Sequence, residues 1–214
     1  LQPVAGILVA YGKIIPQSII DLFEPGIINL HPSLLPRWRG PSPIEAAISH
    51  SDTETGVTIM KLEAAMDAGP IYVQKSIPLT GTETKPELYE TLFSLGNSLL
   101  IDTLPAILSG KLTPTPQTGE PIFCSLLSNH HSLINPKTMT AQQADAHIRA
   151  HLGFPRSRVK LGSDTFIATK AHTSKDADGA LSFPCRDGIY LTIDELISPK
   201  SGKKMTAEAF LRGH

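Results

Sequence analysis

Uninterrupted apolar runs of strand length mark the beginning of the chain. Val4–Ala10 (VAGILVA) forms one such run and residues 26–31 (GIINLH) form another, while Pro16 opens a short helical segment between them. Strands without alternating polar residues are buried on both faces, as in parallel sheets that carry helices on each side. This part of the chain therefore predicts a βαβ unit of a doubly wound α/β domain.

Two more strands are predicted further along, at Thr55–Glu63 and at residues 71–79, where β-branched residues are frequent. A turn bounded by glycine and proline lies between them and carries Asp67. Ser42 and Pro43 have the pattern of an N-cap followed by a first-turn proline, which predicts a short helix before these strands. The alternation of strands and helices thus continues.

A long helix is predicted from about Lys85. Thr84 and Glu87 form a capping-box pattern, and leucines recur at helical spacing as far as Leu99. Gly110 and the two prolines that follow end this helix and open a connector. The first domain is accordingly expected to cover residues 1–112, and the connector residues 113–139.

The last third of the chain predicts a small β-rich domain at residues 140–214. Thr140 and Gln143 cap a helix at its beginning, and a short helix closes the chain. The connector before this domain contains five apolar side chains that we expect to be buried: Ile122, Phe123, Leu126, Leu127 and Ile134. Three short strands are expected between the two helices, at residues 157–162, 165–171 and 188–196.

Composition and charge narrow the class of protein. No stretch reaches the ~18 to 20 consecutive apolar residues of a membrane-spanning helix, and the N-terminus lacks the features of a secretory signal. We therefore expect a cytoplasmic protein without a membrane partner. Residues 1–148 carry 8 Lys and Arg against 13 Asp and Glu, whereas residues 149–214 carry 11 against 7. The two parts are expected to meet different partners.

Metal and disulfide chemistry is not expected. Cys124 and Cys185 lack the paired spacing of a zinc site and the dense pattern of a disulfide framework. His130 and His131 have no Cys, Asp or Glu at metal-ligand spacing around them. The sequence therefore predicts ordinary reduced thiols and no metal site.

Candidate chemistry gathers at the end of the second predicted strand, in the run INLHPSLLPRWRGPSP. Residues i and i+2 of a strand share a face, so Asn29 and His31 are expected side by side at its carboxyl end. Ligands of open α/β sheets bind beyond this edge. Pro32 disfavours helix at His31 and holds that residue extended as the chain leaves the sheet. The spacing predicts two polar groups at one reacting centre.

These residue types suit acyl transfer when Asp67 from the facing turn joins them. An asparagine amide can donate to an oxyanion, and a histidine can donate to it or accept a proton near neutral pH. Asp67 can orient the imidazole or, through a water, take the proton of an attacking amine. The residues alone name no substrate, and each one taken singly is also an ordinary loop, cap or turn residue.

Four motifs occur together in the first domain: NLHPSLLPRWRG, SPIEAAI, TGVTIMKLE and MDAGPI. Together they resemble the 10-formyltetrahydrofolate-dependent formyltransferase family. The resemblance is dense over residues 4–110 and returns over about residues 188–213. In this last part, GKKMTAEAFLRG is most similar to members that formylate methionyl initiator tRNA.

The resemblance implies a fold with two domains. A Rossmann-like formyltransferase domain, partial in this chain, would be followed by a small barrel-like (OB-like), β-rich domain of the tRNA-binding type. Further strands and helices open the first domain in the family, and about three βαβ units, or about 90 residues, are expected before VAGILVAYG. We therefore expect a chain that is N-terminally incomplete, starting as it does at Leu1, and a complete protein that is monomeric.

The resemblance also implies roles for individual residues. Asn29 and His31 match the family's catalytic asparagine and histidine, and Asp67 matches its catalytic aspartate. In such enzymes an amine attacks the formyl carbon of the co-substrate 10-formyltetrahydrofolate; Asn and His stabilise the oxyanion, and Asp assists proton transfer to N10. The segment that contacts the folate is matched by Ser33, Leu34, Leu35 and Pro36.

Formylation of the amino group of methionyl initiator tRNA, for translation initiation, is the leading functional expectation. The alternatives are a formyltransferase that acts on glycinamide ribonucleotide or an amino sugar nucleotide, and a catalytically inactive fragment that binds RNA. The basic residues of the last part could neutralise tRNA phosphates, or form a solvated surface. They include Arg149, Arg156, Arg158, Lys160, Lys170, Lys200, Lys203 and Lys204.

Overall fold

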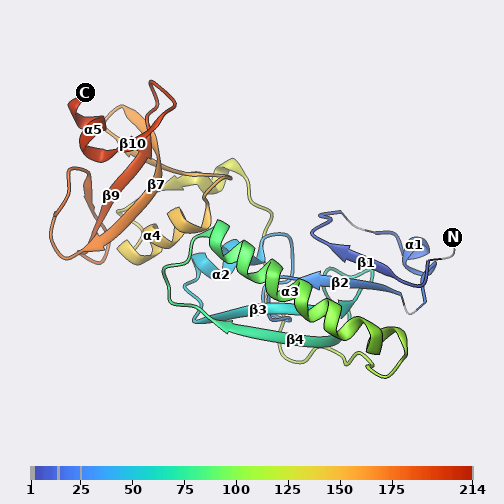
Figure 1. The fold of residues 1–214 in the computed structure, drawn as a ribbon. Helices are drawn as coiled ribbons and strands as arrows, with labels where there is room; N and C mark the ends of the chain where they lie inside the picture. The colour runs from blue at the N-terminus through green and yellow to red at the C-terminus, as the bar shows by residue number, and fades with distance from the viewer. Residues whose placement is uncertain (1–2, 14, 25, 214) are drawn as a thin grey trace. The chain divides into compact units, whose positions relative to one another are not determined.

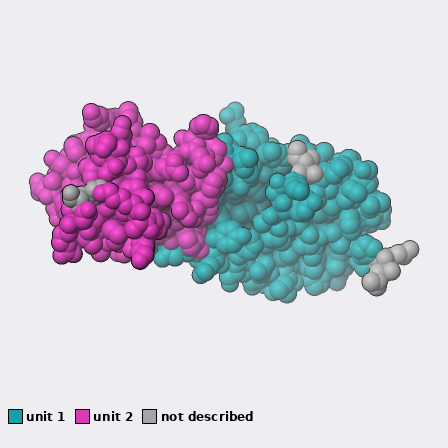
Figure 2. Space-filling view, turned by 90° about the horizontal axis from the view of Figure 1, so that it is seen from above, with its two compact units in different colours: residues 1–47, 53–79, 87–126 teal, residues 48–52, 80–86, 127–214 magenta. Residues whose placement is uncertain are grey.

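The structure, a computed structural model, describes residues 3–13, 15–24 and 26–213 (Figure 1). It divides into two compact units, which Figure 2 shows in different colours. The first unit holds residues 1–47, 53–79 and 87–126, and the second holds residues 48–52, 80–86 and 127–214. Each unit has its own sheet and its own hydrophobic core.

The sheet of the first unit has the strand order β1-β2-β3-β4 in the described part of the chain. These strands are β1 (Gly6–Val9), β2 (Ile27–His31), β3 (Glu54–Lys61) and β4 (Ile71–Pro78). β1 and β2 pair in parallel, with the short helix α1 (Gln17–Ile20) between them in the chain. The predicted βαβ unit is therefore confirmed.

The expected parallel order is wrong beyond β2. β3 pairs antiparallel with both β2 and β4. The helix α2 (Pro43–Ser49) lies between β2 and β3 in the chain, and a turn joins β3 to β4. β3 is as fully buried as a central parallel strand, because an apolar run reports burial on both faces and says nothing about strand direction.

The helix α3 (Lys85–Leu108) lies along the sheet of the first unit (Figure 1). Leu100 and Ile107 of this helix share a hydrophobic core with Leu30 of β2. Gly96 allows the close approach, because a Cβ at this position would lie 2.6 Å from the Leu30 side chain. Removal of these apolar surfaces from water holds the helix on the strands that carry the candidate site.

Among the described helices, α3 is long and apolar enough to cross a membrane by length and composition. The sequence expectation considered only consecutive apolar residues, and α3 contains polar residues between its apolar ones. This observation is weak evidence for a membrane, because the core helix of a soluble protein passes the same test. Leu88 and Leu92 of this helix are buried in the described structure.

The sheet of the second unit follows the order β10-β9-β7-β6-β5, with β8 paired to β9. The three predicted strands are confirmed as β6 (Ser157–Leu161), β7 (Asp164–Ser174) and β9 (Tyr190–Ile197). Three strands that the sequence did not predict are too short to carry a hydrophobic pattern. They are β5 (Leu133–Ile134), β8 (Ser182–Pro184) and β10 (Lys204–Thr206).

Helices complete the second unit. Thr140 and Gln143 form the predicted capping box of α4 (Ala141–Ala150). A short 3-10 helix, η1 (Asn129–Ser132), precedes it, and the predicted closing helix is α5 (Ala207–Arg212). Side chains from α4 and α5 join the strands in one core, in which Phe166 and Phe210 are in contact.

The connector differs from expectation at three of its apolar residues. Ile122, Phe123 and Leu126 are 41%, 57% and 76% exposed, so the prediction of burial is wrong for them, whereas Ile134 is buried as predicted. The backbone explains the difference. The Arg39 N–H donates to the Ile122 carbonyl at 2.9 Å, and the Cys124 N–H donates to the Arg39 carbonyl at 2.8 Å. The connector is therefore held here by backbone pairing rather than by burial of its apolar side chains.

Candidate active site

Asn29 and His31 lie at the end of β2, as predicted. β2 is an interior strand, paired with β1 on one side and with β3 on the other. The two residues are only 6% and 5% exposed. Strand geometry directs both side chains to the same face. The sheet therefore holds an amide and an imidazole as neighbours in a mostly dry environment.

The imidazole of His31 has a defined tautomer. Its Nε2 lies 2.9 Å from the backbone carbonyl oxygen of Trp38. Since a carbonyl oxygen only accepts, Nε2 carries the proton, and Nδ1 of the neutral ring presents a lone pair. Burial lowers the pKa of His31, although the Asp67 carboxylate and the Trp38 carbonyl act in the opposite direction. The ring is thus neutral near pH 7, with Nδ1 able to accept a proton.

Asp67 is brought to this free nitrogen. Its Oδ1 lies 3.7 Å from Nδ1 of His31, which is longer than a direct hydrogen bond. Its Oδ2 accepts a hydrogen bond of 2.8 Å from the backbone N–H of Gly40. The Asp67 side chain is 17% exposed and that of His31 is 6% exposed. The carboxylate therefore lies on the more open side of the pair.

The turn that carries Asp67 is tightly built. Asp67 has a φ of +46°, in the left-handed region that aspartate tolerates better than most residues. Gly69 approaches the backbone so closely that a Cβ there would lie 1.9 Å from the Lys61 carbonyl oxygen. Lys61 in turn donates its N–H to the Pro70 carbonyl at 2.9 Å. The glycine of the MDAGPI motif is thus required by the path of the backbone.

The segment from Ser33 to Pro36 is held by buried hydrogen bonds. The Thr58 hydroxyl donates to the Ser33 carbonyl at 2.6 Å and accepts from the Leu35 N–H at 3.2 Å. The Gln74 amide donates to the Leu35 carbonyl at 2.9 Å. Ser33 and Leu35 are buried, whereas the side chains of Leu34 and Pro36 are half-buried. The predicted folate segment thus rests on a fixed backbone.

Three polar residues near the site were missed by sequence reasoning. Gln74 supports the segment just described. The other two are Arg39 and Gln117, whose side chains are hydrogen-bonded to each other. Nε and Nη2 of Arg39 donate to Gln117 Oε1 at 3.1 Å and 2.7 Å. Gln117 comes from the connector and has no motif around it. The LPRWRG motif, which includes Arg39, was the one signal for that residue.

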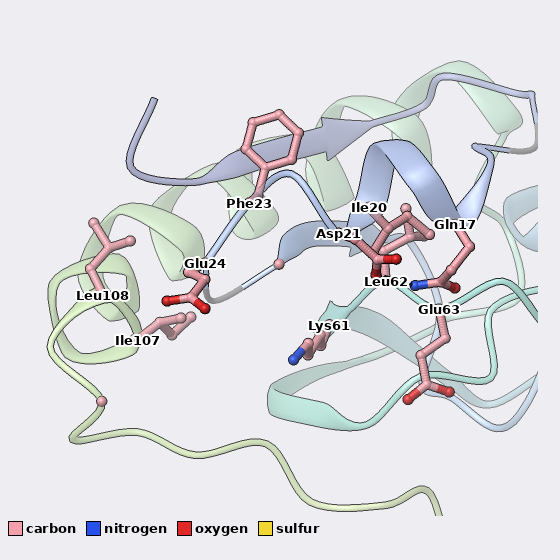
Figure 3. A pocket seen from close by; sticks show the side chains of 12 residues that line it. Gln17, Ile20, Asp21, Phe23, Glu24, Lys61, Leu62, Glu63, Ile107 and Leu108 are labelled. Carbon is pink, nitrogen blue, oxygen red and sulfur yellow. Dashed lines mark hydrogen bonds between the residues drawn. The ribbon is translucent and has the colours of Figure 1, made fainter. Parts of the chain in front are cut away.

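A cavity of about 760 Å³ lies elsewhere in the first unit (Figure 3). Its lining includes none of Asn29, His31 and Asp67. It lies near Gly26, just before β2, and Lys61, the last residue of β3, so it is at the other end of β2 from His31. The lining residues are Gln17, Ile20, Asp21, Phe23, Glu24, Gly26, Lys61, Leu62, Glu63, Ile107, Leu108 and Gly110.

The second unit contains a different group of histidines. His147 of α4 and His151, which directly follows α4, stack edge to face with ring centroids 4.0 Å apart. His147 contacts the Ser157 hydroxyl at 2.9 Å and the His131 carbonyl at 2.7 Å. Burial, and then the charges of His147, His131 and Lys85, lower the pKa of His151 to about 3. Nδ1 of His151 is buried without a hydrogen-bond partner in the described structure.

A third histidine environment lies on the surface of the second unit. Nδ1 of His172 is 2.8 Å from an Asp194 oxygen, and its Nε2 is 3.3 Å from an Asp178 oxygen. Partial burial lowers the pKa of His172, but hydrogen bonds and charges from Asp178 and Asp194 outweigh it and raise the pKa overall. This side chain is 45% exposed.

The basic residues of the second unit are not equally available. Arg149 is engaged within the protein, because its Nε donates to Asp145 at 2.8 Å and its Nη1 to the Glu83 carbonyl at 2.8 Å. Lys204 pairs with Glu195 at 2.6 Å. Arg158, Lys160 and four others have exposed side chains. Those four are Arg156, Lys170, Lys200 and Lys203.

In the ranges that the structure describes, no group of three or more His, Cys, Asp or Glu side chains is arranged to hold a metal.

Comparison with known proteins identifies the family. A family model described as formyl transferase matches residues 1–104. A methionyl-tRNA formyltransferase of Halorhodospira halophila is 34% identical over 224 residues, which cover 100% of this chain and 72% of that protein. The chain belongs to the formyl transferase family. It is accordingly an enzyme of the formyltransferase class, as the sequence motifs predicted.

Solved structures agree with this family in their fold. HypX from Aquifex aeolicus in complex with tetrahydrofolic acid has a TM-score of 0.74 at 18% identity, covering 98% of this chain and 38% of that chain. An N-formyltransferase from Helicobacter canadensis, in complex with folinic acid and dTDP-3-aminofucose, has a TM-score of 0.64 at 18% identity. The match covers 85% of this chain and 70% of that chain. The predicted Rossmann-like formyltransferase fold is confirmed at the level of the α/β architecture.

Proposed function

We propose that this formyltransferase transfers the formyl group of 10-formyltetrahydrofolate to the amino group of methionyl initiator tRNA, which serves translation initiation. The observation that carries the proposal is the approach of Asp67 to the free nitrogen of His31, beside buried Asn29 at the carboxyl end of β2. A base, a carboxylate and an amide donor at this edge of an α/β sheet suit acyl transfer to an amine.

The tautomer of His31 suggests how protons move. The acceptor amine attacks the formyl carbon and forms a C–N bond, while the formyl oxygen takes up negative charge. His31 accepts the amine proton at Nδ1, and the Asp67 carboxylate 3.7 Å away stabilises the imidazolium that results. With the help of Asp67, the proton passes to N10 of the folate as the C–N10 bond breaks. No net proton is consumed.

Asn29 is proposed to stabilise the oxyanion. Its amide N–H groups can donate to the negative oxygen, and they do not titrate. The residue is 6% exposed, so water competes little for these donors. Neutral His31 cannot make the same donation from Nδ1. It can do so only after it has accepted the amine proton, so the two residues act in sequence.

Ser33, Leu34, Leu35 and Pro36 are proposed to contact the folate co-substrate. Two observations support this. Thr58 and Gln74 fix the backbone on both sides of Leu35, and the half-buried side chains of Leu34 and Pro36 offer apolar surface to a flat ring system. The solved HypX structure of similar fold is a complex with tetrahydrofolic acid.

The choice of acceptor rests on the whole length of the chain. The methionyl-tRNA formyltransferase of H. halophila matches 100% of it, including the second unit. We propose that residues 1–112 form the catalytic domain, that residues 113–139 form the linker, and that residues 140–214 form an OB-like domain whose exposed basic residues meet tRNA phosphates. A cytoplasmic monomer is consistent with this role.

An amino sugar nucleotide is the second candidate acceptor. The Helicobacter canadensis N-formyltransferase was solved with dTDP-3-aminofucose, and its fold matches 85% of this chain. The catalytic chemistry would be the same, because an amine attacks the same formyl carbon. The two candidates therefore differ in the surface that binds the acceptor and not in the roles of His31 and Asp67.

An acceptor panel tests the proposal. The full chain is incubated with 10-formyltetrahydrofolate and methionyl initiator tRNA, glycinamide ribonucleotide or an amino sugar nucleotide, and the formylated product is measured. We expect formyl-methionyl-tRNA from the wild-type chain and from the His130→Asn control, which changes an exposed histidine. His31→Asn should form almost none. Product on another acceptor alone would overturn the tRNA assignment. No product on any acceptor, from this chain and from a chain extended by the strands and helices expected before Leu1, would overturn formyl transfer.

A further inference from the structure

Gln117 of the connector contacts the turn that carries Asp67. Its Nε2 donates to the backbone carbonyl of Asp67 at 2.8 Å and to that of Gly69 at 2.8 Å. Its Oε1 accepts both hydrogen bonds of the Arg39 guanidinium. A primary amide has two N–H donors and an oxygen with two lone pairs, so these four bonds use its full capacity.

The contact joins two parts of the candidate site. Arg39 precedes Gly40, whose N–H binds the Asp67 carboxylate. Gln117 therefore connects the backbone carbonyls of Asp67 and Gly69 with the loop that holds the Asp67 carboxylate. Each end of Asp67 is fixed: the carboxylate by the Gly40 N–H, and the peptide group by the Gln117 amide.

The turn needs such support because its backbone is unfavourable. Asp67 adopts a φ of +46°, which a residue with a side chain holds only when its surroundings determine it. Two carbonyls of this turn accept hydrogen bonds from one side-chain nitrogen, Nε2 of Gln117. Without that nitrogen, the turn would lose the hydrogen bonds that select this conformation over others.

Backbone pairing fixes the position of Gln117 itself. The Ile71 N–H donates to the Thr115 carbonyl at 2.7 Å, and the Thr115 N–H donates to the Ile71 carbonyl at 2.8 Å. This bridge places the connector beside the first residue of β4, directly after the turn. Further along, the connector pairs with the backbone of Arg39. The amide is thus anchored on both sides in sequence.

We propose that Gln117, held by Arg39, is a positioning residue that sets the Asp67 carboxylate relative to Nδ1 of His31. This inference rests on the proposed function, because it assigns to Asp67 a role in proton transfer. Gln117 touches the backbone of the turn and acts on the reaction only through Asp67. An error of about 1 Å in the placement of a reacting group can cost about 100-fold in rate.

Two variants of Gln117 and one control test the inference in the full chain. Gln117→Ala removes all four hydrogen bonds. Gln117→Glu keeps the size and the acceptor for Arg39 but replaces the donor with a carboxylate oxygen that faces two carbonyls. Thr118→Ala changes the exposed neighbour and serves as the matched control. Thermal unfolding establishes that each protein is folded, and Gln117→Glu replaces Gln117→Ala if the latter is not.

Kinetics give the first measurement. Both Gln117 variants should lower kcat for formyl transfer to methionyl-tRNA by about 10-fold to 100-fold, while KM for 10-formyltetrahydrofolate stays within about 2-fold. In an Asp67→Asn background, Gln117→Ala should lower kcat by less than about 2-fold, because the group that it positions is already absent. Equal losses in both backgrounds would overturn the inference.

Spectroscopy gives a second measurement that needs no turnover. The ring 15N resonances of His31 report what lies near Nδ1, and Asp67→Asn provides the reference for a missing carboxylate. Gln117→Ala should move the Nδ1 resonance in the same direction as Asp67→Asn, and Thr118→Ala should leave it in place. A wild-type resonance in both folded Gln117 variants would overturn the inference. If neither the wild-type chain nor the extended chain formylates any acceptor, the proposed function fails, and this spectrum still decides the role of Gln117.

Discussion

His31 in the first unit and His151 in the second are both buried histidines whose pKa is lowered by burial. Their surroundings differ in one respect. His31 has a carboxylate 3.7 Å from its free nitrogen, whereas His151 is next to His147, whose charge lowers its pKa further. Burial alone thus favours the neutral ring. A carboxylate within reach gives the ring a means to hold a proton for the duration of a reaction.

The largest effect is expected when this difference is abolished by Asp67→Asn. His31 would then have no carboxylate to stabilise its protonated form, as is true of His151. We expect kcat for formyl transfer to fall by about 100-fold to 10,000-fold, with KM for both substrates within about 3-fold. Steady-state kinetics with 10-formyltetrahydrofolate and methionyl-tRNA measure both quantities.

Glu63→Gln is the matched control for this substitution. It makes the same change from carboxylate to amide in an exposed residue just before the same turn. Its kcat should stay within about 2-fold of the wild type, since Glu63 has no contact with His31. A loss of kcat as large as that of Asp67→Asn would show that the charge of the whole turn matters, rather than its approach to His31.

A smaller effect, on stability instead of rate, is expected from His151→Gln. In the folded protein the pKa of His151 is about 3, whereas in the unfolded chain it is about 6.5. The free energy of unfolding should therefore fall as the pH drops below 6.5. One such group contributes a slope of up to about 1.4 kcal/mol per pH unit.

Urea unfolding of the second unit between pH 7.5 and pH 4.5 measures this slope. His151→Gln should make the dependence less steep, while His130→Gln, at an exposed position, should keep the wild-type slope. Formyl transfer at pH 7.5 should stay near the wild-type rate in His151→Gln. An unchanged slope in this variant would show that the buried ring does not oppose protonation.

The smallest effect is expected at His172, where two carboxylates meet a ring that is exposed rather than buried. They raise the pKa of His172, so its contribution to stability is complete below pH 6.5 and is lost as the pH rises through the higher folded pKa. His172→Gln should lower Tm by about 2 °C or less at pH 6, and by less at pH 8.5.

Calorimetry at low and high salt checks this prediction. The difference in Tm between wild type and His172→Gln should shrink in 0.5 M salt, because the Debye length then falls to about 4 Å to 5 Å and exposed charges are screened. A difference that grows with pH would contradict the assignment. Together, the three histidines separate two variables, since only His31 combines burial with a nearby carboxylate.

Much of the fold could be predicted because its longer elements carry regular patterns. β2 and α3 follow from an apolar run and from leucines at helical spacing, and α4 follows from its capping box. Strand direction could not be predicted, because apolar residues report burial alone. β8 and β10 are three residues each, which is too short for any period to be recognised.

The candidate site was predictable where it is local in sequence. Asn29 and His31 are two positions apart on one strand, so strand geometry alone places them together. The approach of Asp67 to His31 depends on the tertiary structure, and it was expected from the position of the turn between the two following strands and from resemblance to the family. The bonds from Gln117 to the turn join residues 50 and 48 positions apart. No spacing rule relates such residues, so a side chain amide in a connector gave no signal.

Thr58 shows how closely one position of this enzyme is constrained. Its hydroxyl donates to the Ser33 carbonyl and accepts from the Leu35 N–H and the Gln74 amide. A hydroxyl has one hydrogen to give and two lone pairs, so every bond that it can form is used. Valine has the same shape and suits a strand equally well, yet it would remove all three of these hydrogen bonds. Natural variation at this position should therefore admit serine and exclude valine, even though a β-propensity scale would rank them the other way.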